Sequence, residues 1–202
     1  MKKLISLVML MAFAGAAGSV GAAGNAAAGK NKSAVCAGCH GVDGNSAAPN
    51  FPKLAGQDAQ YTAKQLADFK SGARKDPVMA GMAAGLSKKD MDDLGAYFAS
   101  QKRTPGTPSA SADALKKAER LYRGGNAKSG IAACMSCHGP AGTGIPPRFP
   151  VVSGQHAAYS QKQLLDFKVG TRNNDSEVMT RTAFLLSEAE IKAVSEYMAG
   201  LH

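Results

Sequence analysis

The pattern Cys-x-x-Cys-His occurs twice in this chain of 202 residues, at positions 36–40 and 134–138. The two copies use all four cysteines, and this spacing is the one that attaches c-type haem. Two thiols add to the haem vinyl groups as thioethers, and the histidine that follows binds the iron from one side. The expected attachment residues are Cys36, Cys39, Cys134 and Cys137. We therefore expect two covalently bound haem c groups, with His40 and His138 as iron ligands and a function tied to electrons.

Disulfides and zinc are the other common uses of four cysteines. A disulfide gives no role to the histidine that follows each second cysteine. A zinc site needs its ligands gathered together, whereas the two motifs lie 98 residues apart and form no compact ligand cluster. The motif spacing therefore favours haem over both alternatives.

The second half of the chain repeats the first half. At an offset of 98, residues 36–75 match residues 134–173 at 20 of 40 positions. Two extra residues then enter the second copy, and the offset becomes 100. A period this long is typical of tandem domains rather than of a solenoid. Between the copies, residues 104–111 are rich in Pro, Gly, Ser and Thr, which is linker composition.

The first residues predict a secretory signal peptide. A basic start at Lys2 and Lys3 precedes an uncharged apolar run, and the small residues around Ala22 offer a cleavage site. The run is shorter than the roughly 20 residues that cross a membrane. The expected organisation is a signal peptide at 1–22, an N-terminal cytochrome c domain at 23–103, a linker at 104–112 and a C-terminal cytochrome c domain at 113–202.

Within each domain the pattern predicts helices and no sustained strand. Residues at helical spacing indicate a helix from Asp58 or Ala59 to Lys70, and Ser87 is placed to cap a second helix. A third helix follows the linker, with Asp113 as its expected cap. We therefore expect an all-α fold of two tandem haem domains joined by a short linker.

The ligand on the second side of each iron separates an electron carrier, which fills that position, from an enzyme, which leaves it open. His156 aligns with Asp58 and His202 has no matching histidine in the other copy, so neither suits a repeated site. Met79 and Met179 align with each other in an expected loop between two helices. Methionine is usually core filler, but its thioether is a soft ligand for haem iron. We assign Met79 and Met179 to the two irons, with Met82 as the alternative in the first half.

Two further pairs of aligned residues are candidates to support the haems. The carbonyl of Pro52 or Pro150 could accept the N–H of the axial imidazole and orient it. Arg74 and Arg172 could pair with haem propionates. The alternatives are a structural turn for the prolines and a solvated surface charge for the arginines.

The charge of the chain excludes one class of partner. The formal net charge of +9 falls to +7 when Lys2 and Lys3 leave with the signal peptide. The remaining charges are scattered, and no Lys/Arg run resembles a nucleic-acid patch. A mildly basic rim could still steer docking to an acidic protein.

These residues resemble the cytochrome c4 family over nearly the whole mature chain. The similarity is clearest from Cys36 to Gln57, at residues 154–156 and at residues 96–102. The resemblance implies two class-I-type cytochrome c domains with His/Met ligation at each iron. It also implies haems that lie near one another across the domain interface, and electron delivery toward a terminal oxidase.

We therefore expect a periplasmic dihaem electron-transfer protein that is not an enzyme. It would pass electrons from respiratory donors toward a terminal oxidase and bind no small-molecule substrate and no nucleic acid. Its partners would be redox proteins, and peripheral association with the membrane is left open. One alternative is the cytochrome subunit of a flavoprotein sulfide dehydrogenase. A dihaem peroxidase is less favoured, because the paired methionines would close both iron sites.

Overall fold

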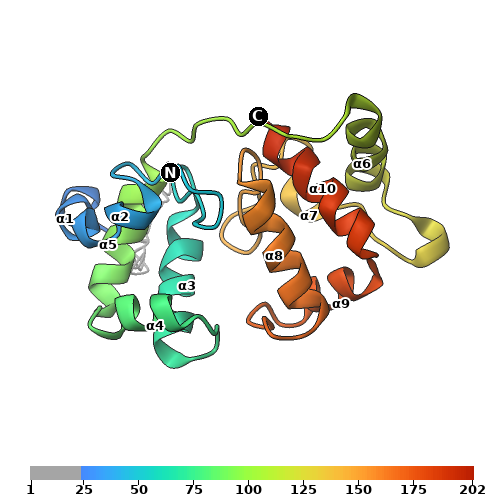
Figure 1. The fold of residues 1–202 in the computed structure, drawn as a ribbon. Coiled ribbons are helices and arrows are strands. Elements are labelled where there is room, and N and C mark those ends of the chain that lie inside the picture. The colour runs from blue at the N-terminus through green and yellow to red at the C-terminus, as the bar shows by residue number, and fades with distance from the viewer. Residues whose placement is uncertain (1–23) are drawn as a thin grey trace, which may run out of the picture.

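The computed structural model describes residues 24–202 and forms two helical domains side by side (Figure 1). The predicted signal peptide at 1–22 lies outside the described residues. The N-terminal domain consists of α1 (Ala26–Lys32), the 3-10 helix η1 (Ser33–Val35), α2 (Ala37–His40), α3 (Ala59–Ser71), α4 (Pro77–Ala84) and α5 (Lys88–Ala99). The C-terminal domain consists of α6 (Ala112–Gly124), the 3-10 helix η2 (Ala127–Ser129), α7 (Met135–His138), α8 (Ala157–Lys168), α9 (Val178–Leu185) and α10 (Glu188–Gly200). Over residues 24–202, β pairing is limited to two isolated bridges, which confirms the predicted all-α fold.

In the N-terminal domain, α5 is the central helix, and both α1 and α3 pack against it. The Asp58 carboxylate caps α3 by accepting from the backbone N–H of Tyr61 at 2.8 Å, and α3 ends at Gly72 in the left-handed conformation. Ser87 and Asp90 form a reciprocal capping box at the start of α5. The helices predicted to begin near residue 58 and at residue 87 are therefore confirmed.

In the C-terminal domain, α10 takes the central place and packs against α6 and α8. The prediction that Asp113 caps α6 is wrong: the cap is Ser111, whose hydroxyl accepts from the backbone N–H of Ala114. Asp113 already lies in the first helical turn, where a carboxylate favours the positive end of the helix dipole without capping it. The helix itself is present as predicted.

The two domains differ in the size of their apolar cores. In the N-terminal domain a contiguous cluster of buried side chains contains three residues, Leu94, Tyr97 and Phe98. The corresponding cluster in the C-terminal domain contains ten: Leu121, Tyr122, Ile131, Leu164, Phe167, Ala183, Leu186, Ile191, Val194 and Met198. Two of the ten, Leu121 and Tyr122, come from α6, which is 13 residues long where α1 has seven.

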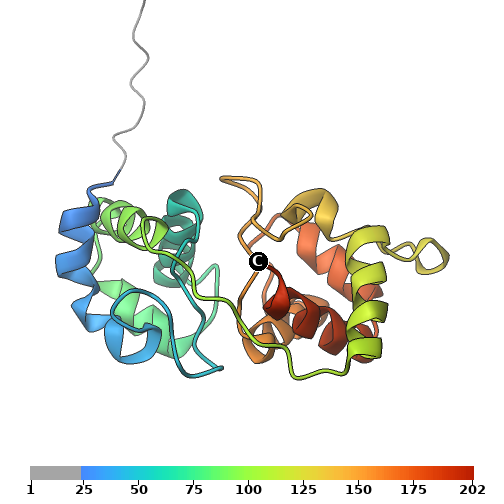
Figure 2. The ribbon, with the colours of Figure 1, turned by 90° about the horizontal axis from the view of Figure 1, so that it is seen from above.

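The chain between α5 and α6 is extended and crosses from one domain to the other (Figure 2). The buried Lys53 ammonium donates to the backbone carbonyls of Thr104 at 2.9 Å and Pro105 at 3.1 Å. The Arg103 guanidinium donates to the carbonyl of Ala55 at 2.7 Å. The linker is therefore attached to the N-terminal domain; the boundaries predicted at 104 and 112 stay a prediction. None of the helices within residues 24–202 has the length and apolarity needed to span a bilayer.

Candidate haem sites

Each Cys-x-x-Cys-His motif forms one short helical turn. In the first copy the backbone N–H of His40 donates to the carbonyl of Cys36 at 3.0 Å, and in the second that of His138 donates to Cys134 at 2.9 Å. Residues three and four positions apart share one face of a helix, so both thiols and the imidazole project to the same side. All four cysteines are free. Each motif can therefore form two thioether bonds and one axial iron bond to a single haem.

Each axial histidine is oriented by a proline carbonyl. The Nδ1 atom of His40 lies 2.9 Å from the carbonyl oxygen of Pro52, and that of His138 lies 2.9 Å from the carbonyl oxygen of Pro150. A carbonyl can only accept, so Nδ1 carries the proton and Nε2 is left with the lone pair that binds iron. The predicted contact between the imidazoles and the proline carbonyls is confirmed.

The same histidines are shielded from water. His40 is 6% exposed and His138 is 7% exposed. A phenylalanine ring (Phe51 or Phe149) approaches each imidazole at a centroid distance of 6.2 Å. Burial lowers the pKa of both histidines, which keeps the imidazole neutral, the form that binds a metal.

A cavity of about 1440 Å³, lined by both domains, includes all the cysteines and histidines of the two motifs. Pockets for a single small ligand are roughly 300–1,000 Å³, so this cavity has room for two large cofactors. Its walls carry apolar side chains from each domain, among them Phe69, Leu94, Leu164 and Phe167. The motif geometry and the volume together fit two haems, one attached to each domain.

A zinc site does not fit these residues. In the part of the chain that the structure describes, no group of three or more His, Cys, Asp or Glu side chains is arranged to hold a metal ion.

Both predicted methionine ligands line the cavity. They do not lie in a loop, as expected, but in the first turns of the short helices α4 and α9. In each case an aspartate fixes the backbone: Asp76 accepts from the N–H of Met79 at 3.0 Å, and Asp175 accepts from the N–H of Met179. The alternative, Met82, also lines the cavity and is 40% exposed.

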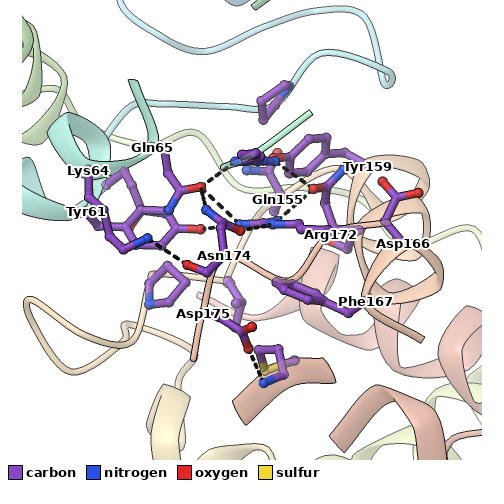
Figure 3. Close-up of a pocket in the computed structure, with 18 of the residues that line it drawn as sticks. Tyr61, Lys64, Gln65, Gln155, Tyr159, Asp166, Phe167, Arg172, Asn174 and Asp175 are labelled. Carbon is purple, nitrogen blue, oxygen red and sulfur yellow. Dashed lines mark hydrogen bonds between the residues drawn. The ribbon is translucent and has the colours of Figure 1, made fainter. Parts of the chain in front are cut away.

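The aligned arginines lie in the contact between the domains, and neither is a solvated surface charge. Arg74 and Arg172 are each 8% exposed. The Arg74 guanidinium donates to Gln163 at 2.6 Å in the other domain. The Arg172 guanidinium donates to Gln65 at 3.2 Å in the reverse direction (Figure 3). Each also reaches a tyrosine hydroxyl of the opposite domain. The two arginines therefore join α3 to α8.

Two glutamines that the sequence analysis left without a role make a second reciprocal contact. The Gln57 side chain exchanges two hydrogen bonds of 3.0 Å with the backbone of Val151. The Gln155 side chain does the same with the backbone of Lys53, at 2.8 and 2.9 Å. Gln57 and Gln155 match each other in the repeat, and this match is a sequence signal that could have identified them.

His156, which does not suit a repeated iron site, also contacts the other domain. Its Nε2 atom lies 2.9 Å from the hydroxyl and 3.0 Å from the carbonyl oxygen of Ser46. Burial, with the nearby positive charges of Lys53 and Arg103, lowers the pKa of this histidine. Its aligned counterpart is Asp58, so no repeat signal could have pointed to this contact.

Comparison with known proteins agrees with this geometry. The family model described as Cytochrome c matches residues 23–102 and 125–202. Cytochrome c4 of Pseudomonas aeruginosa is 49% identical, over 100% of this chain and 99% of the relative. The thiosulfate dehydrogenase electron acceptor of Stutzerimonas stutzeri is 42% identical, over 86% of this chain and 82% of the relative. The crystal structure of reduced recombinant cytochrome c4 from Pseudomonas stutzeri superimposes with a TM-score of 0.85 at 48% identity, covering 89% of this chain and 100% of that chain.

The chain is thus a cytochrome c with two domains, and it belongs to the cytochrome c4 family. Its function is electron transfer, in which it acts with redox partners. The pairs Cys36/Cys39 and Cys134/Cys137 are the attachment points for two covalent haem c groups.

Proposed function

We propose that His40 and Met79 bind one haem iron from opposite sides, and that His138 and Met179 bind the other. The observation that carries this assignment is the matched setting of the two methionines. Each lines the cavity that holds both motifs, and each has its backbone N–H fixed by an aspartate. Met91 and Met135 do not line this cavity, and Met198, which does, belongs to the buried apolar cluster of the C-terminal domain. A His/Met pair raises the reduction potential of a haem relative to other ligand sets.

With both sides of each iron filled by protein, the chain carries electrons and does not act as an enzyme. A bound haem supplies the one-electron chemistry. The protein orients each imidazole through a proline carbonyl and surrounds the cofactors with apolar side chains. Fixed ligands limit the rearrangement that accompanies the arrival of an electron. The shared cavity lets an electron pass between domains without leaving the protein.

The partners that we propose are respiratory donors and a terminal oxidase in the periplasm. The signal-like start of the sequence supports export, and the net positive charge supports docking to acidic protein surfaces. A second candidate donor is a thiosulfate dehydrogenase, because one relative is named as the electron acceptor of that enzyme at 42% identity. The two donors are distinguished by mixing the oxidised protein with a purified thiosulfate dehydrogenase or with respiratory membranes and measuring the rate of haem reduction.

The ligand assignment is tested in the oxidised dihaem protein through the methionine-to-iron charge-transfer absorption band. Met79→Ala and Met179→Ala should each remove about half of this band, and the double variant should remove all of it. Met82→Ala is the matched control, because Met82 also lines the cavity and should leave the band unchanged. A halved band in Met82→Ala with a full band in Met79→Ala would move the first ligand to Met82. A full band in Met179→Ala would refute the assignment in the C-terminal domain.

A further inference from the structure

The segment before Met179 is longer than its counterpart before Met79. From Arg172 to Met179 the chain advances seven positions, whereas from Arg74 to Met79 it advances five. The two added residues fall in the loop between α8 and α9, next to the contact between the domains. Both loops begin at an arginine of the domain contact, but the longer loop of the C-terminal domain has room for a further contact.

Asn174, in this longer loop, contacts α3 of the other domain at several atoms (Figure 3). Its side-chain amide donates to Gln65 at 3.1 Å and to the carboxylate of Asp68 at 2.5 Å. Its backbone carbonyl accepts from the Lys64 ammonium at 2.7 Å. Within its own domain, its side-chain oxygen accepts from Arg172 at 3.1 Å. Asn174 is half-buried, and both its side chain and its backbone are held by the N-terminal domain.

The N-terminal domain makes no equivalent contact in the reverse direction. On α8, Lys162 and Asp166 stand where α3 has Lys64 and Asp68, and they form the same ion pair at 2.5 Å. Among the described residues, however, no hydrogen bond joins this pair to the loop before Met79. The two arginines hold both ligand loops reciprocally, but the additional contact at Asn174 holds only the loop before Met179.

The residues between Asn174 and Met179 transmit this hold. Asp175 directly follows Asn174 and accepts from the N–H of Met179 and from the hydroxyl of Thr180. Ser176 and Glu177 then adopt positive φ angles of 57° and 65°, which residues other than glycine disfavour. A backbone of this kind persists where its surroundings hold it in place. The neighbouring contacts to α3 are part of those surroundings.

We infer that Asn174 is a positioning residue through which α3 of the N-terminal domain holds Met179 in place for the iron of the C-terminal haem. The loop before Met79 reaches the other domain through Arg74 and has no counterpart of the Asn174 contact among the described residues. This inference rests on the proposed ligation of iron by Met179. It follows that cutting the contact at Asn174 loosens one methionine–iron bond and leaves the other unchanged.

The experiment measures how readily imidazole displaces each methionine from oxidised iron. In a Met79→Ala background the remaining charge-transfer band reports Met179, and in a Met179→Ala background it reports Met79. Asn174→Ala and Asp68→Ala cut the contact from its two sides. Asp166→Ala is the matched control, because it breaks the same kind of ion pair without touching the loop.

Asn174→Ala and Asp68→Ala should each lower the imidazole concentration that displaces Met179 by about three- to tenfold, the range expected for losing one or two hydrogen bonds. In the double variant this imidazole concentration should be no lower than in the more affected single variant, because both changes remove the same contact. Displacement of Met79 should be unchanged, and Asp166→Ala should affect neither methionine.

The inference would be overturned if the imidazole concentration that displaces Met179 is the same in Asn174→Ala, Asp68→Ala and Asp166→Ala. That result would leave the proposed function intact, provided that Met179→Ala still removes half of the band. If Met179→Ala leaves the band whole, the ligand assignment has failed and the inference fails with it. The two failures are therefore distinguishable.

Discussion

The two domains keep the same haem site but cover it with different amounts of protein. The imidazole-to-proline distance is 2.9 Å in both, and the imidazole-to-phenylalanine distance is 6.2 Å in both. The apolar clusters behind the site differ: the N-terminal core has one of three residues and the C-terminal core has one of ten. Cofactor geometry constrains the contacts of the imidazoles tightly, whereas many combinations of well-packed apolar side chains can form the core.

The difference in core size predicts an unequal dependence on haem, and this is the largest effect that we expect. Replacing Cys36 and Cys39 with alanine should lower the thermal midpoint of the affected domain by more than about 10 °C relative to the same change at Cys134 and Cys137. A large buried side chain contributes ~1.5–3 kcal/mol, and 1 kcal/mol shifts the midpoint of a small domain by ~4–8 °C. Circular dichroism at a helical wavelength follows both transitions.

Haem content measured by pyridine haemochrome serves as the control for this comparison, since each variant should retain one attached haem. Equal midpoints in the two double variants would show that the larger C-terminal cluster does not replace cofactor contacts.

A smaller effect concerns tyrosines that hold the chain just after each axial histidine. The Tyr97 hydroxyl of α5 donates to the carbonyl of Val42 at 2.8 Å, and the Tyr122 hydroxyl of α6 donates to that of Gly139 at 2.8 Å. Tyr97→Phe and Tyr122→Phe should each lower the free energy of unfolding by ~1 kcal/mol, because each removes one hydrogen bond of ordinary length.

Tyr197 is the matched control for these two substitutions. It aligns with Tyr97 in the repeat, yet its hydroxyl reaches only Glu119, at 3.5 Å. Tyr197→Phe should therefore change the free energy of unfolding by less than about 0.5 kcal/mol. Denaturant titration checks all three substitutions. If Tyr197→Phe lowers the free energy of unfolding as much as Tyr97→Phe does, the tyrosines that match in sequence, and not those that match in position, are the equivalent pair.

The smallest effect is a pH dependence at His156, which stands where the N-terminal domain has Asp58. The folded protein lowers the pKa of His156, chiefly through burial. As the pH falls below the ordinary value of about 6.5, the unfolded chain therefore binds a proton before the folded chain does. Stability should fall from about pH 6.5 down to the lowered pKa and then level off.

The change at His156 should stay below about 1 kcal/mol, because water reaches part of the ring and screens its charge. His156→Gln should remove this component from denaturant titrations run between pH 8 and pH 5. If the free energy of unfolding differs between pH 8 and pH 5 as much in His156→Gln as in the unchanged protein, the pH dependence comes from other groups.

The repeat made much of the haem site predictable. Each copy of the motif located the other, and the alignment placed Pro52 and Pro150 next to the imidazoles, where the structure has them. Local signals also worked well: the capping pattern at Ser87 indicated a helix start that is present. These features depend on short spacings or on two matching copies.

What the sequence did not predict depends on contacts between distant segments. Arg74 reads as an exposed charge because its partners, Tyr159 and Gln163, lie more than 80 positions away. Asn174 has no aligned counterpart, so comparison of the copies gave no signal for it. Tyr122 takes over a contact that alignment would assign to Tyr197, and only the packing of α6 against α10 reveals the exchange.

The reciprocal contacts of Gln57 and Gln155 have a consequence for the origin of the two-domain chain. Gln57 pairs with the backbone at position 151 and Gln155 with that at position 53, so each contact maps onto the other at the offset of the repeat. This is the pattern of an isologous interface, in which two identical subunits exchange the same contacts about a twofold axis. A short tether raises the effective concentration of its two ends to the millimolar range. Fusion of two such subunits therefore keeps together a pair whose separate affinity could be as weak as about 1 mM.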